Sequence, residues 1–132
     1  MIYVSVSLLT INAHFLSLTP TSTILLNDLL PLMRSTAALL KVDVEGHEVN
    51  VFTESSAGRF FDEVDVRLVF VEWMQCKRRS PGVVRRLLDF FHTRDYIAYD
   101  TSDDKLLTAN YRHWPRNVLF KKTAYISYRF YM

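Results

Sequence analysis

The stretch 37–52, AALLKVDVEGHEVNVF, decides the fold because a buried strand runs directly into a helix there. Residues 37–43 are apolar almost throughout and end on Asp43, and a run without polar alternation is typical of a parallel strand covered on both faces. The apolar spacing within 45–56 then predicts a helix. Gly46 lies at the turn between them, where it either permits a positive φ or a close approach, or is an ordinary turn residue.

Further strands and helices are predicted on both sides of this stretch. A second apolar run at 66–72 also ends on a carboxylate, Glu72, and indicates another buried strand. Ser80 and Pro81 suit the cap and the first position of a helix, and apolar residues recur at helical spacing after them. The same patterns predict a helix capped by Asn27 or Asp28, and extended segments at 23–26, 96–99 and 117–120.

The order of these elements predicts an α/β fold with a parallel sheet, helices on its faces and one reversed strand at the end. A chain of 132 residues has the length of one domain, which we assign to residues 21–122. The apolar segment 1–20 fits three roles: a strand, a signal or membrane anchor, or an artefact of the chain start. The polar stretch 100–116 is long for a hairpin and is expected to be functional or mobile, and the tail 123–132 is unassigned.

Composition argues against several classes of function. A net charge of +2 is too small to favour a nucleic-acid partner. One cysteine, Cys76, excludes a disulfide framework and a cysteine-rich zinc site. Three glycines in the whole chain do not supply the loops that cradle phosphate. The basic residues at 77–79 and 85–86 lack interleaved aromatics and are expected to form a solvated surface, with contact to an acidic ligand left open.

Three carboxylates follow the two buried strands. Asp43 and Glu45 come after the first strand, and Glu72 ends the second. Sites in open parallel sheets form beyond the carboxyl ends of the strands, and neighbouring strands lie about 5 Å apart, so we expect Asp43 and Glu72 to share one crevice. The alternatives are helix caps or ion pairs with nearby Arg and Lys side chains. A cation site is a further alternative, but acids on two loops need not converge, and we assign no metal.

Several residues in the stretch 39–52 stand where the FkbM family of S-adenosylmethionine-dependent methyltransferases has its central motif. That motif is an apolar strand, Lys-Ile-Asp-Val-Glu-Gly, one further residue and Glu. The residues here in those places are Lys41, Asp43, Glu45, Gly46 and Glu48. Upstream, TILLNDLL at 23–30 resembles the family's Thr-x-x-Leu-x-Asp-Leu-Leu segment, and LVFVEW at 68–73 resembles its following strand. The resemblance extends from about residue 21 to residue 122.

The resemblance implies the carboxyl-terminal half of a class I (Rossmann-like) methyltransferase sheet, with parallel strands, an antiparallel last strand and flanking helices. It implies S-adenosylmethionine as cofactor and a small-molecule or sugar hydroxyl as methyl acceptor, with Asp43, Glu45 and Glu72 as the catalytic residues. The family's first three strands and its glycine-rich cofactor turn have no counterpart here. We therefore expect this chain alone to bind S-adenosylmethionine weakly or not at all.

A different class of function is a truncated or degenerate relative that folds, or pairs with another chain, without catalysis. A half-sheet leaves an unpaired strand edge and a bare apolar face, so self-association is expected. His47 is expected to face solvent at the helix start rather than to act as the base. We expect no nucleic-acid partner, and a membrane partner only if the segment 1–20 is an anchor.

Overall fold

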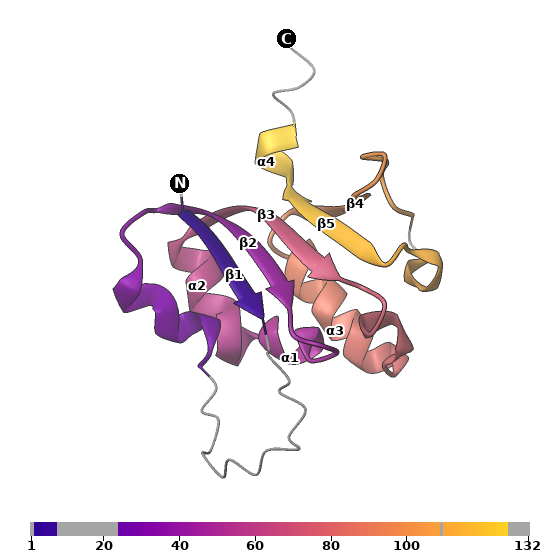
Figure 1. Ribbon diagram of the computed structural model, residues 1–132, viewed down its shortest axis with the longest axis horizontal. Helices are drawn as coiled ribbons and strands as arrows, with labels where there is room; N and C mark the ends of the chain where they lie inside the picture. The colour runs from indigo at the N-terminus through magenta and orange to yellow at the C-terminus, as the bar shows by residue number, and fades with distance from the viewer. Residues whose placement is uncertain (1, 8–23, 109, 127–132) are drawn as a thin grey trace, which may run out of the picture.

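The computed structural model describes residues 2–7, 24–108 and 110–126, which form one five-stranded sheet with helices packed against it (Figure 1). The strands are β1 (Ile2–Ser7), β2 (Ala37–Asp43), β3 (Asp65–Glu72), β4 (Tyr96–Asp100) and β5 (Asn117–Lys122). The α-helices are α1 (Glu48–Val51), α2 (Arg59–Glu63), α3 (Pro81–His92) and α4 (Thr123–Ile126). Short 3₁₀ or π-helical segments are η1 (Leu26–Leu32), η2 (Glu54–Gly58), η3 (Cys76–Arg78) and η4 (Tyr111–His113).

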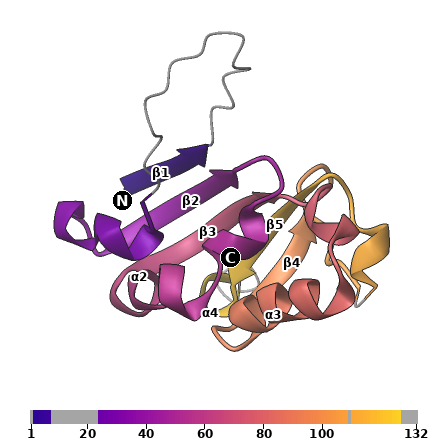
Figure 2. The same cartoon turned by 90° about the horizontal axis from the view of Figure 1, so that it is seen from below.

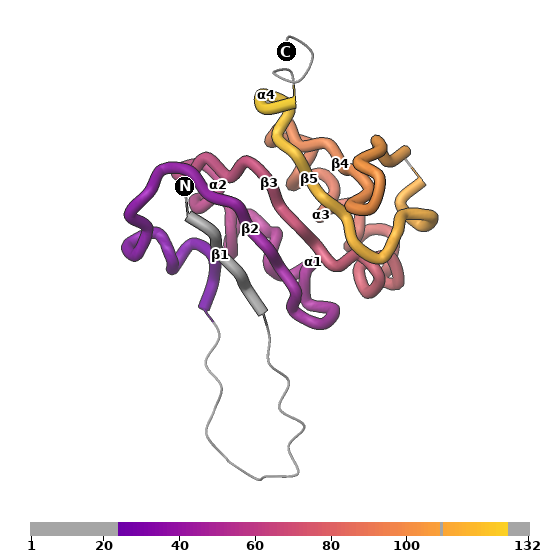
Figure 3. Tube along the Cα trace, turned by 45° about the horizontal axis from the view of Figure 1, so that its top comes forward, coloured from indigo at the N-terminus to yellow at the C-terminus, as the bar shows by residue number. Residues whose placement is uncertain are grey.

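The strand order is β1-β2-β3-β5-β4. β1, β2 and β3 are parallel (Figure 1). β5 lies between β3 and β4 (Figure 3) and runs antiparallel to both. This arrangement confirms the predicted α/β class with an antiparallel last strand. The strand alternative for the apolar amino-terminal segment holds for Ile2–Ser7, which pairs with residues 38–43 of β2. Residues 8–20 of that segment lie outside the described residues.

The helices cover one face of the sheet, as the view along the sheet shows (Figure 2). Strand residues on that face are buried, and they include Ala38, Leu40, Val42, Val66, Val69, Val71, Val118 and Phe120. On the other face no described helix covers the centre, where Leu39, Leu68, Phe70 and Leu119 are partly exposed. The short helix α4 reaches only the start of β3 there. The bare apolar face is thus confirmed for the part of the chain that is described, and the prediction of helices on the faces holds for one face only.

An aromatic cluster joins the helices to the covered face. The ring of Phe91 in α3 stacks on that of Phe120 in β5, with centroids 3.9 Å apart and planes at 6°. The rings of Phe52, Phe61 and Tyr96 surround Phe91 with centroids at 4.7, 6.2 and 5.6 Å. α3 begins at Pro81, as predicted. The buried, apolar side of this helix faces the cluster.

The prediction of one continuous helix over 45–56 is wrong, because the helix is interrupted. α1 ends at Val51, and a new helical segment starts after Thr53, whose Oγ1 accepts a hydrogen bond from the backbone N–H of Ser56 at 3.2 Å. The π-helical turn η2 and then α2 follow directly, and Gly58 lies where the two join. The physical reason is local: a threonine hydroxyl that caps free N–H groups begins a helix rather than continuing one.

The predicted cap near residue 27 also has a different role. η1 begins at Leu26, and Asp28 accepts a hydrogen bond from the backbone N–H of Leu25 at 2.8 Å. Asn27 instead makes long-range contacts: its Oδ1 accepts from the N–H of Phe60 at 2.9 Å and its Nδ2 donates to the carbonyl of Ser55 at 3.0 Å. Asn27 therefore fastens η1 to η2 and α2.

The polar stretch between β4 and β5 packs against the end of β3. Trp73, which directly follows β3, is fully buried, and its Nε1 donates a hydrogen bond to the carbonyl of Tyr111 at 2.9 Å. The rings of Trp73 and Trp114 lie with centroids 5.0 Å apart. The backbone N–H of Trp73 also bonds the carbonyl of Arg116 at 2.6 Å. This buried tryptophan thus holds the loop that brings Arg116 beside the end of β3.

The first residues of the unassigned tail form the short helix α4 beside the start of β3. The Tyr125 hydroxyl donates to Asp65, and the Arg67 guanidinium lies 4.7 Å from the centroid of the Tyr125 ring. Residues 127–132 lie outside the described residues. Among the helices that the structure describes, none has both the length and the apolar character needed to cross a bilayer.

We expect Phe91→Ala to lower the free energy of unfolding by about 3–5 kcal/mol, because the change removes a buried ring from a close-packed aromatic cluster. Urea denaturation monitored by circular dichroism measures this loss. The neighbouring exposed residue supplies the control: His92→Ala should change stability by less than about 0.5 kcal/mol. Equal losses in the two variants would contradict the packing account.

Candidate functional site

The two central parallel strands place three carboxylates at one edge of the sheet. Asp43 ends β2, Glu72 ends the neighbouring β3, and Glu45 lies in the turn after β2. One carboxylate oxygen from each of the three lies within 4.8 Å of the others. The structure therefore brings together the three residues that the sequence singles out, while their catalytic role stays a prediction.

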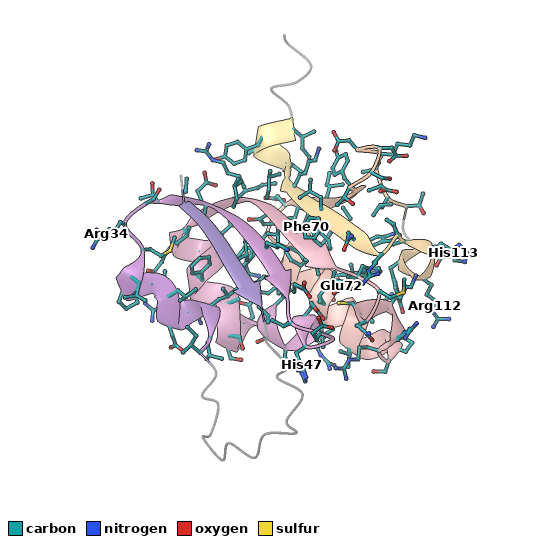
Figure 4. The ribbon with its side chains drawn as sticks, in the orientation of Figure 1. Arg34, His47, Phe70, Glu72, Arg112 and His113 are labelled. Atoms are coloured by element: carbon teal, nitrogen blue, oxygen red, sulfur yellow. The ribbon has the colours of Figure 1, made fainter. Side chains whose placement is uncertain are left out.

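These carboxylates line a pocket of about 450 Å³ that opens on the uncovered face of the sheet. Its lining residues are Lys41, Asp43, Glu45, Phe70, Glu72, Arg116 and Asn117. Phe70 and Glu72 are two residues apart and lie on the same side of β3 (Figure 4). A pocket of this size suits a small molecule, and it combines one aromatic wall with charged groups of both signs.

Arg116 is the ion-pair partner of Glu72. Its Nη2 and Nε lie 3.1 and 3.2 Å from the same oxygen of Glu72, Oε1. The side chain of Glu72 is 15% exposed, whereas that of Arg116 is 71% exposed. The alternative of ion pairing with a nearby Arg is therefore realised for Glu72, and the three carboxylates still outnumber the two cations of the pocket, Lys41 and Arg116.

Burial raises the pKa of Glu72 above its ordinary value, and the adjacent Asp43 raises this pKa further. Arg116 opposes both effects, but the pKa remains raised. Oδ1 of Asp43 is buried and has no hydrogen-bond partner among the described residues. A proton held on Glu72 would give the Asp43–Glu72 pair a donor, and such a shared proton is the expected behaviour of two close carboxylates.

An unusual turn after β2 carries Glu45 into this group. Glu45 has φ 51° and Gly46 has φ 95°, so two consecutive residues occupy the left-handed region. The positive-φ prediction for Gly46 is thus confirmed. For a residue with a side chain this conformation costs about 1 kcal/mol, so surrounding contacts must hold Glu45 there.

Glu48, a motif residue whose role the sequence did not reveal, is fully buried and stabilises the turn. Its Oε1 accepts a hydrogen bond from the backbone N–H of Val44 at 3.1 Å, and its Oε2 lies 3.9 Å from the Sγ of Cys76. Burial raises the pKa of Cys76 to about 12, so the thiol stays protonated and donates. The one local signal was the spacing, since Glu48 lies four residues after the N–H that it binds.

A second restraint on the turn comes from the basic segment after β3. Nη2 of Arg79 donates to the carbonyl of Gly46 at 2.6 Å. Lys77 donates to the carbonyl of Trp114 at 3.3 Å. These two cations therefore make tertiary contacts, whereas Arg78, Arg85 and Arg86 are exposed as the predicted solvated surface requires.

His47 is exposed at the start of α1, as expected, and lies at the lower edge of the molecule, away from Glu72 (Figure 4). Its Nδ1 lies 3.4 Å from the Nδ2 of Asn50. Asp43, Glu45 and Glu72 offer the oxygen ligands that a hard cation prefers, and among the described residues they are the one group of carboxylates, histidines and cysteines with this geometry. Nothing beyond the clustering points to a bound ion.

The sequence profile of the methyltransferase FkbM domain matches residues 3–98 of this chain. The chain belongs to the FkbM methyltransferase family. The match includes β1, β2 and β3, and with them all three carboxylates of the pocket. No curated protein and no solved structure was found to match the chain. The assignment to this FkbM family therefore rests on the domain match together with the parallel sheet and its antiparallel last strand.

Gly46→Ala should destabilise the FkbM-type turn by about 1–2 kcal/mol, because alanine resists the left-handed conformation. An added Cβ would lie 3.5 Å from the Cβ of Gln75, an ordinary contact, so the loss comes from the backbone. Gly82→Ala is the matched control. Gly82 lies in the first turn of α3, and nothing lies within 4 Å of the Cβ that alanine would add. We therefore expect its stability to be unchanged or raised. Urea unfolding compares the two, and equal effects would contradict the strained turn.

Carbon-13 NMR titration should give Glu72 a pKa above 4.5, and Asp43→Asn should lower that pKa because the neighbouring negative charge disappears. Since the folded state holds this proton more tightly than the unfolded chain, the stability contributed by Glu72 is complete below pH 4.5 and is lost as the pH rises through the folded pKa. Asp62→Asn, at a side chain that is 68% exposed, is the control. A Glu72 pKa that does not fall in Asp43→Asn would contradict the paired arrangement.

Proposed function

We propose that the acid-lined pocket holds the methyl acceptor of an S-adenosylmethionine-dependent O-methyltransferase, and that the acceptor is a small-molecule or sugar hydroxyl. The observation that carries this proposal is the Asp43–Glu72 pair: two close carboxylates, one with a raised pKa, at the rim of parallel strands in an FkbM domain. Transfer to a hydroxyl requires removal of its proton, and a carboxylate with a raised pKa is a better base than an ordinary one.

Each carboxylate has a distinct role in this proposal. Glu72 accepts the hydroxyl proton of the acceptor, and Asp43 orients that hydroxyl. Arg116 holds Glu72 through Oε1, which fixes the direction of the carboxylate. Glu45, at the exposed rim, binds a second polar group of the acceptor. Holding the acceptor oxygen in line for attack supplies most of the rate advantage in a displacement of this kind.

S-adenosylmethionine, when bound, supplies a methyl group on a sulfonium centre. Because the three carboxylates contact the acceptor in this proposal, the pocket leaves Lys41 and Arg116 as groups suited to the carboxylate of the cofactor. The three glycines of the chain, Gly46, Gly58 and Gly82, lie apart in the sequence and form no glycine-rich turn. These residues fit the cofactor's polar groups only in part, which supports the expectation of weak binding by this chain alone.

The alternative function is that of a relative without catalysis. The bare sheet face favours it, because an open pocket next to uncovered apolar surface does not exclude water from a reaction. The two functions differ in one measurable property, which is whether the cofactor or its product binds at the acid-lined pocket.

Titration of the nitrogen-15-labelled chain with S-adenosylhomocysteine tests the proposal. We expect chemical-shift changes confined to the ends of β2 and β3, with a Kd weaker than about 1 µM. Lys41→Ala should reduce these changes, whereas Asp62→Asn, outside the pocket, should not. No shift at any concentration, or shifts elsewhere in the chain, would favour the relative without catalysis, and tighter binding would contradict the expectation of weak affinity.

Release of S-adenosylhomocysteine from S-adenosylmethionine in the presence of a panel of monosaccharides tests the chemistry. Glu72→Gln should lower kcat by about 10²–10⁴-fold, since an amide does not accept the proton. Asp43→Asn should affect KM more than kcat, because its proposed role is orientation. Unchanged turnover in Glu72→Gln would exclude this residue as the base.

A further inference from the structure

Basic side chains gather next to the acid-lined pocket. Residues 73–88 contain five basic residues and no acidic one, and residues 110–117 contain two arginines, one histidine and no acidic residue. The two segments touch, because Nζ of Lys77 donates to the carbonyl of Trp114 at 3.3 Å. The net charge of +2 for the whole chain is therefore unevenly distributed. Five side chains of these segments form what we call the basic surface: Lys77, Arg78, Arg79, Arg112 and His113.

The positive charge of the basic surface is not neutralised within the described residues. Arg78 and Arg112 are exposed. Arg79 donates to a backbone carbonyl, which accepts a hydrogen bond without cancelling a full charge. Among the residues that the structure describes, no carboxylate forms an ion pair with any member of this surface. Two carboxylates of the turn after β4 pair with Lys105 and Lys121 instead.

The basic surface borders the acid-lined pocket. Arg79 donates to the carbonyl of Gly46, which directly follows the pocket residue Glu45. In Figure 4 Arg112 lies to the right of Glu72, at the same end of the sheet. A ligand that extends out of the pocket on this side therefore passes from carboxylates to uncompensated cations.

We propose that the methyl acceptor is an anionic oligosaccharide, of which one hydroxyl enters the acid-lined pocket while the acidic groups lie on the basic surface. This inference rests on the proposed function and names its substrate class. The pocket carboxylates repel an acidic group, and the basic surface attracts it. Charge therefore orients the acceptor, so that an uncharged hydroxyl rather than an acidic group lies next to Glu72.

The side chains around the basic surface favour a saccharide over a nucleic acid. Single-stranded nucleic acids bind where bases stack on exposed aromatic rings. In the two segments that carry the basic surface, Trp73 and Trp114 are buried and Tyr111 is half-buried, so these rings offer no such platform. Guanidinium groups bind the oxygens of carboxylates, sulfates and phosphates alike. An acidic saccharide supplies these oxygens and the hydroxyl for the pocket in one molecule.

Titration of the nitrogen-15-labelled full chain with tetragalacturonate, and separately with a sulfated heparin tetrasaccharide, tests the proposal. At low salt we expect a Kd of about 1 mM or tighter for at least one of them, and the tighter ligand identifies the acidic group. Chemical shifts should change at the basic surface and at the ends of β2 and β3. Neutral maltotetraose should bind more weakly, and a tetra-aspartate peptide, which has no hydroxyl on its side chains, should shift the basic surface alone.

Three results would overturn the proposal. They are no binding of either acidic saccharide, equal binding of maltotetraose, and saccharide-induced shifts that stay confined to the basic surface. Pocket shifts of equal size with tetra-aspartate would also overturn it, because they would show that any acidic chain suffices.

Charge reversals locate the binding surface. Arg112→Glu and Arg78→Glu, one in each segment, should each weaken binding of the acidic saccharide by about fivefold, because repulsion replaces attraction. Arg34→Glu is the matched control: Arg34 is an exposed arginine at the far side of the molecule (Figure 4), and its reversal should change the Kd by less than about twofold. Far-UV circular dichroism checks that all three variants fold. Equal effects at Arg34 and at the basic surface would overturn the proposal. The cofactor is absent from these titrations, so a negative result here is distinct from a negative result with S-adenosylhomocysteine.

Discussion

The candidate site depends on one buried carboxylate, that of Glu48. Burying a carboxylate is costly unless hydrogen bonds satisfy it, and Glu48 meets this requirement with the N–H of Val44 and the thiol of Cys76. These bonds join the turn after β2 to the segment after β3. Arg79 joins the same two segments through the carbonyl of Gly46. These contacts hold the ends of β2 and β3 together. The carboxylates of Asp43 and Glu72 can therefore stay close to each other at the pocket.

The cluster of Asp43, Glu45 and Glu72 is electrostatically unfavourable in itself. Two like charges about 4.8 Å apart repel by about 3–4 kcal/mol at the effective dielectric constant of a protein surface, and Arg116 offsets only part of this. Burial and the neighbouring Asp43 together raise the pKa of Glu72, so the cost of the cluster falls on this carboxyl group. A sheet edge with only a structural role would be more stable with fewer carboxylates. A cluster of carboxylates is therefore typical of a site that binds cations or moves protons.

Local signals explain what the sequence predicted well. β2 and β3 agree with their predicted bounds within a residue, and α3 begins at the predicted Pro81, because an apolar run and a Ser-Pro start each consist of adjacent residues. The meeting of Asp43 and Glu72 followed from the parallel pairing of those strands. The break before Thr53 and the role of Glu48 were missed, because they depend on side-chain hydrogen bonds. The partner of Glu48 lies 28 residues further along the chain, and a single sequence carries no signal for such a contact.

The acid-lined pocket lies on the face of the sheet that no described helix covers. The helix-covered face uses fully buried side chains such as Val69 and Val71, while Phe70 and Lys41 on the other face line both the apolar depression and the acid-lined pocket. Whatever covers the apolar centre therefore also forms a wall of that pocket. Methyl transfer needs the acceptor held in line and water kept out, and a pocket open along one side provides neither fully. Covering the sheet and completing the site are thus a single structural requirement.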